Sequence, residues 1–412
     1  MLKKILLGAA PVLAAVLVAG CSADALGFYD KALPGGGEYA MADGDVESGG
    51  GGGREPGSGS GNTSAGIVTA GEWRDLDHWA FWSSLMTGED FSGKTDLWKM
   101  YPDNLVAVHA LNGEGMPRIG AKVVLYRNGK AVWTARTDNK GYAYLWVSPF
   151  QPLQELSADE LTLNVGGNEI SEHPVLSTWH SQSEIKINEY KIMTADAQPV
   201  ISNVTDIAFI VDATGSMGDE IDFLKDDLVD ILGKASAKAG SGVKLRTAAV
   251  FYRDEGDTYV TRTDNFNADY NKTVSFIKKQ EADGGGDYPE AVHTALETAL
   301  QSLSWGEDAR MKVAFLLLDA PAHDRAEVKA SLQKSVEMFA SLGIRIVPIA
   351  ASGADKDTEF MLRFFDILTG GTYTFLTNDS GVGGDHIAAS VGEYEVEHLN
   401  DLIVRLIAGY LE

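Results

Sequence analysis

The stretch Ile207-Ala-Phe-Ile-Val-Asp212-Ala-Thr-Gly-Ser-Met-Gly218 decides the fold of the C-terminal half of the chain. Five apolar residues in a row are typical of a strand that is buried on both faces. Similar apolar runs follow at 247–252, 313–318 and 344–349, with helical patterns between and after them. This alternation predicts an α/β domain with an open, mostly parallel, doubly wound sheet, whose ligands bind beyond the carboxyl ends of the strands.

Oxygen-bearing side chains gather where these strands end. Asp212 and Asp319 directly follow two of the apolar runs, and Thr214 and Ser216 occupy the turn after the first run. A third segment, Gly284-Gly-Gly-Asp287-Tyr-Pro-Glu, forms a glycine-rich loop before another helical pattern. Since the carboxyl ends of parallel strands share one edge, we expect the three segments to converge. Hard oxygen ligands suit a divalent cation, with Mg²⁺ first and Mn²⁺ or Ca²⁺ as alternatives.

The three segments, in this order, resemble the metal-ion-dependent adhesion site of von Willebrand factor A (vWA) domains, and the resemblance covers residues 203–412. The family pattern is Asp-x-Ser-x-Ser, then a Thr in a second loop, then an Asp after a later strand. Asp212, Thr214 and Ser216 match the first motif, with Thr keeping the first hydroxyl, and Asp319 matches the last. The resemblance implies that these residues and Asp287 bind a cation. It also implies a protein that binds other proteins, in adhesion or in scaffolding an envelope complex, without catalysis. An acidic group of the partner is expected to complete the coordination.

Asp287 stands where many members of this family carry the second-loop Thr. With Asp212, Asp287 and Asp319 ionised, a divalent ion would sit in a formal charge of 2 − 3 = −1. The additional carboxylate is expected to tighten cation binding and to weaken the attraction of the ion for an acidic partner. Asp287 can act as a direct ligand or through a water. The neighbouring glycines 215, 284, 285 and 286 let the backbone approach the ion.

Other interpretations of these segments stay open. Taken separately, Ser216 with Asp219 forms a capping box, and Asp287 begins a helix. A phosphate-binding loop is disfavoured, because neither glycine-rich turn carries GxxxxGK[ST] or GxGxxG. A metal-dependent hydrolase remains the alternative function, with His323 as the general base beside Asp212, Asp287 and Asp319. A stretch that begins at Asp355 resembles the start of an EF-hand loop but lacks its glycine.

Two further segments precede the α/β domain. Residues 104–192 alternate apolar and polar positions, and the Asn128-Gly129 pair predicts a two-residue hairpin turn, so we expect a small antiparallel β-sandwich. The sandwich resembles immunoglobulin-like and carboxypeptidase-regulatory-like modules, which implies a spacer or a partner-binding module. Residues 67–103 form an aromatic-rich linker. Its aromatic side chains either pack on the next domain or form an exposed partner surface.

The N-terminus predicts export. Residues 1–20 combine an early Lys pair with a short apolar run, as in a signal peptide, and Leu17-Val-Ala-Gly-Cys21 resembles the lipobox of bacterial lipoproteins. That resemblance implies a lipid anchor on Cys21, at the outer membrane of a Gram-negative host because Ser22 follows. Residues 21–66, rich in Gly, Ser and acidic residues, are expected to form a flexible tether.

Overall charge and cysteine content exclude several functions. The 412 residues contain 34 Lys and Arg against 59 Asp and Glu, a net charge of −25, which disfavours binding of nucleic acid. Cys21 is the only cysteine, so a disulfide framework and a thiolate metal site are both excluded. Any metal must therefore be bound by oxygen or histidine.

Overall fold

The computed structural model describes residues 68–152, 155–178, 187–195, 202–239, 242–380 and 384–412. The predicted signal peptide, Cys21 and the predicted tether lie outside these residues. In the described part of the chain, no helix is both long and apolar enough to span a membrane. The elements are β1 (Thr69–Trp73), α1 (Trp79–Thr87), α2 (Lys94–Trp98), β2 (Leu105–Asn112), β3 (Lys122–Arg127), β4 (Lys130–Arg136), β5 (Tyr142–Trp146), β6 (Leu161–Val165), β7 (Asn168–Ile170), β8 (Glu189–Thr194), β9 (Ser202–Asp212), α3 (Gly218–Ala239), β10 (Lys244–Tyr252), β11 (Thr261–Asn267), α4 (Tyr270–Ile277), α5 (Val292–Ser302), β12 (Ala309–Leu318), α6 (Ala326–Leu342), β13 (Arg345–Ala350), α7 (Lys356–Thr369), β14 (Tyr373–Leu376), β15 (Glu397–His398) and α8 (Leu399–Leu411).

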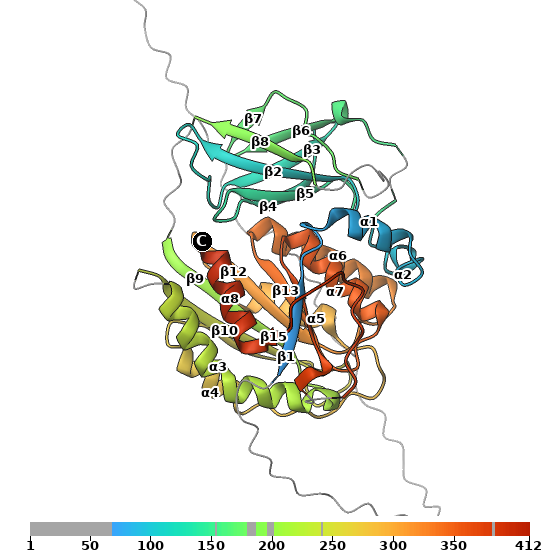
Figure 1. The fold of residues 1–412 in the computed structure, drawn as a ribbon, viewed down its shortest axis with the longest axis vertical. Coiled ribbons are helices and arrows are strands. Elements are labelled where there is room, and N and C mark those ends of the chain that lie inside the picture. Colours follow the sequence, from blue (N-terminus) through green and yellow to red (C-terminus); the bar gives the residue numbers. More distant parts are fainter. Residues whose placement is uncertain (1–67, 153–154, 179–186, 196–201, 240–241, 381–383) are drawn as a thin grey trace, which may run out of the picture. The chain divides into compact units, whose positions relative to one another are not determined.

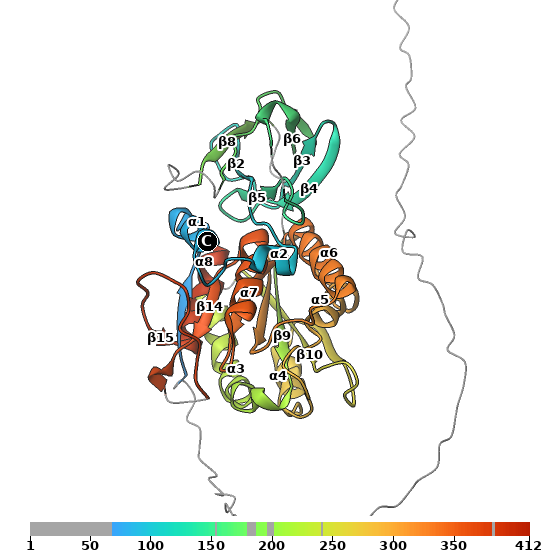
Figure 2. The ribbon, with the colours of Figure 1, turned by 90° about the vertical axis from the view of Figure 1, so that its right-hand side faces the viewer.

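The C-terminal half forms the predicted α/β domain around an eight-stranded sheet, in the order β11-β10-β9-β12-β13-β14-β1-β15. The five strands from β10 to β14 are parallel. One hydrophobic core lies between the sheet and α3, α4 and α8, and another lies between the sheet and α5, α6 and α7. Figures 1 and 2 show helices on both faces of this sheet. The prediction of a mostly parallel, doubly wound sheet is confirmed.

Strand β1 belongs to this sheet, although the sequence places residues 67–103 in a linker outside the α/β domain. It pairs antiparallel with β14, from Ala70 opposite Leu376 to Trp73 opposite Tyr373. The aromatic side chains that follow it are buried: Trp79 and Trp82 are fully inaccessible to solvent, and Trp98 is 2% exposed. These aromatic residues therefore pack in the core and do not form an exposed surface.

The described residues between 104 and 195 form a small β-sandwich of two sheets, β5-β2-β8 and β4-β3-β6-β7. Asn128 and Gly129 both have positive φ angles, of 50° and 77°, and make the predicted hairpin turn between β3 and β4. One pair departs from the antiparallel expectation, because β2 and β8 run parallel. The period-2 pattern predicts strands but does not determine the direction in which distant strands pair.

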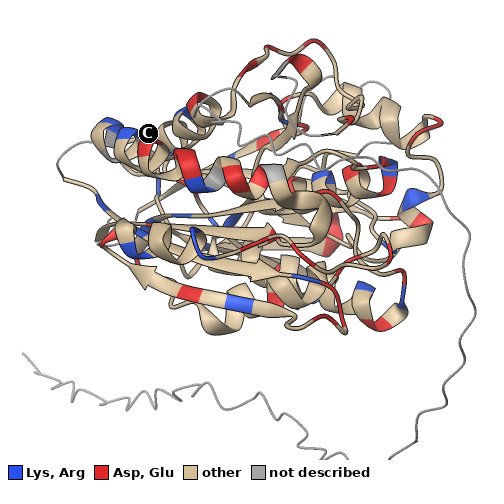
Figure 3. Ribbon diagram, turned by 90° about the horizontal axis from the view of Figure 1, so that it is seen from below, with Lys and Arg blue, Asp and Glu red and all other residues tan. Residues whose placement is uncertain are grey.

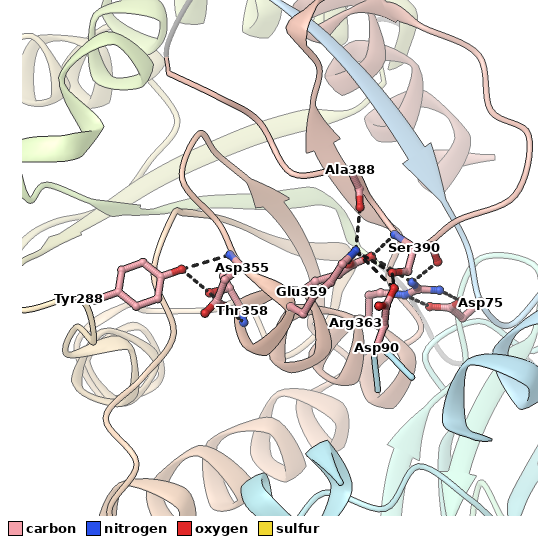
Figure 4. A network of polar contacts seen from close by, with 10 residues as sticks. Asp75, Asp90, Tyr288, Asp355, Thr358, Glu359, Arg363, Ala388 and Ser390 are labelled. Carbon is pink, nitrogen blue, oxygen red and sulfur yellow. Dashed lines mark hydrogen bonds and ion pairs between the residues drawn. The ribbon is translucent and has the colours of Figure 1, made fainter. Parts of the chain in front are cut away.

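A buried ion pair fastens the N-terminal segment to helix α7. The guanidinium of Arg363 donates to both carboxylate oxygens of Asp75, at 2.8 and 2.5 Å, and to Glu359 at 3.2 Å. All three side chains are fully buried. Figure 4 shows this network together with Ser390, whose carbonyl accepts from Arg363 at 2.6 Å. Residues that are distant in the sequence are thus held in one polar cluster. Figure 3 shows acidic and basic residues interspersed over helices, strands and loops.

The Asp75→Ala variant tests whether this segment is an integral part of the α/β domain. Loss of the carboxylate leaves the Arg363 charge poorly compensated in the interior, so the free energy of unfolding should fall by about 3–5 kcal/mol. Asp77→Ala is the matched control, because its ion pair with Arg74 is exposed and should contribute less than about 1 kcal/mol. Urea unfolding measures both changes. Equal losses of unfolding free energy in the two variants would show that the ion pair between Asp75 and Arg363 does not hold the N-terminal segment to the α/β domain.

Candidate metal-ion site

Two aspartates lie at the carboxyl edge of the parallel sheet. Asp212 is the last residue of β9, and Asp319 follows the last residue of β12. Val211 of β9 pairs with Leu317 of β12, so the two strands end at almost the same level. Asp212 is fully buried and Asp319 is 4% exposed. The fold therefore brings together two carboxylates that are 107 positions apart in the sequence.

The charge of Asp319 raises the cost of ionising Asp212. Burial, followed by the charge of Asp319, raises the pKa of Asp212 to about 7. Hydrogen bonds to Asp212 Oδ1 from the amide and hydroxyl of Thr214, at 2.9 and 2.7 Å, oppose this shift, and Tyr252 on the next strand opposes it further. A cation bound beside these two buried acids would lower the free-energy cost of their negative charge.

Glu290 is a third buried acid of this region, and the sequence interpretation gave it no role of its own. Its amide donates to Pro321 O at 2.9 Å, and its side chain is 4% exposed. Burial, followed by the charges of Asp212, Asp254, Asp319 and Asp257, raises its pKa to about 9. The signal was present in the sequence, because Glu290 ends the glycine-rich segment. Nothing in the sequence, however, indicated that its side chain turns inward.

The other predicted site residues lie nearer the surface. Ser216 is exposed in the short 3-10 turn Gly215–Met217, and Asp287 is exposed in the glycine-rich loop. Among the described residues, no group of three or more His, Cys, Asp or Glu side chains is arranged to hold a metal ion. The structure therefore does not gather Asp287 with Asp212 and Asp319 into a three-carboxylate site. A cation site formed by the carboxylates of Asp212 and Asp319 and the hydroxyls of Thr214 and Ser216 stays a prediction. A role for Asp287 in binding the cation also stays a prediction.

His323 is engaged elsewhere. Its Nε2 atom lies 2.7 Å from Asp254 Oδ1, just beyond the end of β10. One ring nitrogen of His323 thus contacts a carboxylate that is not among the predicted metal ligands. The hydrolase alternative gains no support from this contact.

The loop after β10 holds the two glycine-rich segments together, a role that the sequence gave no reason to expect. Arg253, which is 5% exposed, donates from Nε to Ala213 O at 3.1 Å and from Nη2 to Glu281 O at 2.9 Å. Asp257 accepts a hydrogen bond from the amide of Gly285 at 3.0 Å. Gly284 has a φ of +79°, and a Cβ there would lie 2.5 Å from an Asp257 oxygen. Only glycine fits this close approach.

Tyr288 ties the glycine-rich loop to the start of α7. Its hydroxyl contacts the carbonyl oxygens of Asp319 and Gly353, at 3.3 and 3.2 Å, and accepts from the amide of Asp355 at 3.1 Å. Figure 4 shows this hydroxyl pointing at Asp355 and Thr358. The loops that carry the predicted ligands are therefore fixed by a shared set of hydrogen bonds.

Comparison with known proteins shows which domains this part of the chain resembles. Residues 206–347 match the family model described as von Willebrand factor A domain. The C-terminal part of the chain is therefore similar to vWA domains and has a vWA-like α/β fold with a mostly parallel central sheet.

Similar proteins share parts of the chain. An ariadne-like RING finger protein of Acanthamoeba polyphaga mimivirus is 28% identical over 133 residues, which cover 32% of this chain and 13% of that protein. Among solved structures, a von Willebrand factor type A protein from Catenulispora acidiphila is 14% identical and covers 76% of this chain and 50% of its own (TM-score 0.33). Proximal thread matrix protein 1 of the mussel byssus, described with a zinc-occupied MIDAS motif, is 18% identical and covers 52% and 47% of the two chains (TM-score 0.37). This chain thus spans about half or less of the length of these relatives.

The buried acids predict a specific pH dependence for the metal-free protein. A carboxyl whose folded pKa is raised stabilises the fold below its unfolded pKa and loses that contribution as the pH rises through the folded value. In EDTA, stability should therefore decline from about pH 5 to about pH 9, because Asp212 titrates near 7 and Glu290 near 9. Glu290→Gln should flatten the upper part of this decline, as measured by melting temperature at each pH. If the melting temperature of Glu290→Gln fell with pH as steeply as that of the wild type, the assignment of the upper part of the decline to Glu290 would be wrong.

Proposed function

We propose that the vWA-type domain binds a partner protein in a manner that depends on a divalent cation. Asp212, Thr214, Ser216 and Asp319 would hold the ion, and Mg²⁺ fits an all-oxygen set best, with Mn²⁺ or Ca²⁺ as alternatives. The observation that carries this proposal is the burial of Asp212 beside Asp319 at one sheet edge, with the pKa of Asp212 raised to about 7. Such an arrangement is costly unless a positive charge compensates it.

The surrounding residues fit an ion at this point. One carboxylate oxygen of Asp212 accepts both hydrogen bonds from Thr214, while Oδ2 accepts none of standard geometry from the described residues. The amide of Gly215 lies 3.3 Å from Gly284 O, so the first and second loops already touch. A bound cation would neutralise the two aspartates and offer an open position to an acidic group of the partner.

We propose no catalytic activity, and we place the protein in the cell envelope. Export and acylation of Cys21 would anchor the chain, and residues 21–66 would hold the folded part away from the membrane. The anchor would lie in the outer membrane if the host is Gram-negative. The β-sandwich would serve as a spacer or as an additional partner-binding module. Adhesion and scaffolding of an envelope complex both fit this arrangement.

Cation dependence is tested by thermal melts in EDTA and in a saturating series of Mg²⁺, Mn²⁺ or Ca²⁺. The wild type should be stabilised by about 2.7 kcal/mol when the free cation reaches 100 times its Kd. Asp212→Asn should abolish this gain and should not lower the melting temperature in EDTA, because it removes a buried charge. Asp222→Asn, on the exposed face of α3, is the matched control and should respond like the wild type.

Partner binding is read from the same variants by affinity capture from envelope extract. Capture should require the cation and should fail for Asp212→Asn but not for Asp222→Asn. Melting curves that are identical with and without cation, or capture that is insensitive to chelator, would overturn the proposal.

The anchor is tested separately by labelling cells with a palmitate analogue. The wild-type protein should carry the label in the membrane fraction, and Cys21→Ala should lose it, because no other cysteine is available for acylation. Ser22→Ala provides the control that leaves the cysteine in place. Label that persists on Cys21→Ala would remove the anchor from the account.

A further inference from the structure

A cavity lies at the edge of the sheet opposite to Asp212 and Asp319. It encloses about 330 Å³ between the end of β4 in the sandwich and the starts of β12 and β13. Its wall includes Arg136 from β4, Lys312 from β12 and Arg345 from β13. The sequence analysis assigned no function to any of these three cations.

Two of these cations form no ion pair with a carboxylate in the described part of the chain. Arg345 is neutralised by Asp138, at 2.5 Å. Arg136, by contrast, donates from Nη1 to Gly120 O at 3.1 Å, and its buried Nε donates to no atom of the described residues. Lys312 is 6% exposed, and its Nζ donates to Gly306 O at 3.2 Å. Neither side chain forms an ion pair with any other described residue.

This lack of ion pairs contrasts with two other cations that are largely removed from solvent. Arg363 has two carboxylate partners, and Arg246 makes a two-pronged pair with Asp206, at 2.8 and 2.6 Å. Arg136 and Lys312 thus share one cavity, and neither forms an ion pair within the described part of a chain that contains 59 acidic residues. A buried positive charge of this kind is expensive unless an anion accompanies it.

Arg136 and Lys312 also repel each other. Burial, followed by the charge of Arg136, lowers the pKa of Lys312 to about 8. Three acids oppose the shift only in part: Asp206 is already paired with Arg246, and Glu307 and Asp308, which also line the cavity, are exposed. The positive charge at this point of the wall therefore remains incompletely balanced.

We propose that this cavity binds a small oxyanion, of the phosphate or dicarboxylate class, between Arg136 and Lys312. A planar guanidinium and an ammonium together suit a compact group with several oxygens. The volume lies at the lower end of ligand pockets, which favours a small ligand over a nucleotide or a polyanion. Because Arg136 belongs to the sandwich and Lys312 to the vWA-type domain, the anion would link the two.

Binding is tested on the EDTA-treated full chain, so that the metal site takes no part. The protein is melted and titrated calorimetrically with sodium phosphate and, in a second arm, with sodium malonate, each against sodium chloride at matched ionic strength. One or both anions should raise the melting temperature saturably, and the arm with the lower Kd identifies the class. Asp212→Asn should respond like the wild type, which separates this site from the proposed metal site.

Two variants localise the effect. Lys312→Met should lose the saturable response and melt no lower than wild type without anion, because an apolar side chain replaces a buried unpaired cation. Arg136→Gln should weaken binding of the anion at least about tenfold, since it removes a charge-assisted contact. This variant provides the test of the site if Lys312→Met fails to fold. Lys122→Gln, exposed on β3, should bind like the wild type. A response no larger than that to chloride, or unchanged binding in Arg136→Gln, would overturn the proposal.

Discussion

The repulsion between Asp212 and Asp319, held side by side in a low-dielectric environment, is the constraint on which the rest of the α/β domain depends. Parallel pairing of β9 with β12 forces the two carboxylates to the same edge. Water cannot screen either charge, because both side chains are buried. A fold that retains such a pair needs either a shared proton or a cation, and a site made of acids and hydroxyls is suited to the second.

Hydrogen bonds connect the loops around this edge. Arg253 and Asp257 join the first loop to the glycine-rich loop, and Tyr288 joins the glycine-rich loop to the start of α7. The same helix carries Arg363, which binds the N-terminal segment through Asp75. The residues predicted to bind the cation are thus connected by contacts that extend from this edge of the sheet to the N-terminal segment. A well-positioned site reduces the entropy lost when an ion or a partner binds.

The sequence predicted those features that depend on local pattern. Continuous apolar runs predicted the parallel strands. Asp212 and Asp319 were predicted to share one edge of the sheet because each directly follows such a run. It did not predict features that depend on long-range pairing. Strand β1 lies more than 100 residues upstream of β9. The periodicity of its sequence does not indicate that it pairs with β14. The parallel pairing of β8 with β2 was missed for the same reason.

The composition of the site was also only partly predictable. Hydroxyl and carboxylate residues in a turn are visible as a motif, whereas the burial of Glu290 follows from how the loop folds back toward Pro321. Arg253 and Asp257 act through backbone atoms of other loops, and such contacts leave no sequence signature. The exposed position of Asp287 similarly depends on the path of the glycine loop.

The most direct measurement of the central claim is the location of a bound ion. Crystals grown with Mn²⁺ and measured at an anomalous wavelength would reveal it. The account predicts one strong peak at the carboxyl edge of β9 and β12, with oxygen ligands from Asp212 and Asp319, directly or through water, at the short distances typical of hard cations. A map with no peak at this edge, at a Mn²⁺ concentration that saturates any thermal shift, would contradict it.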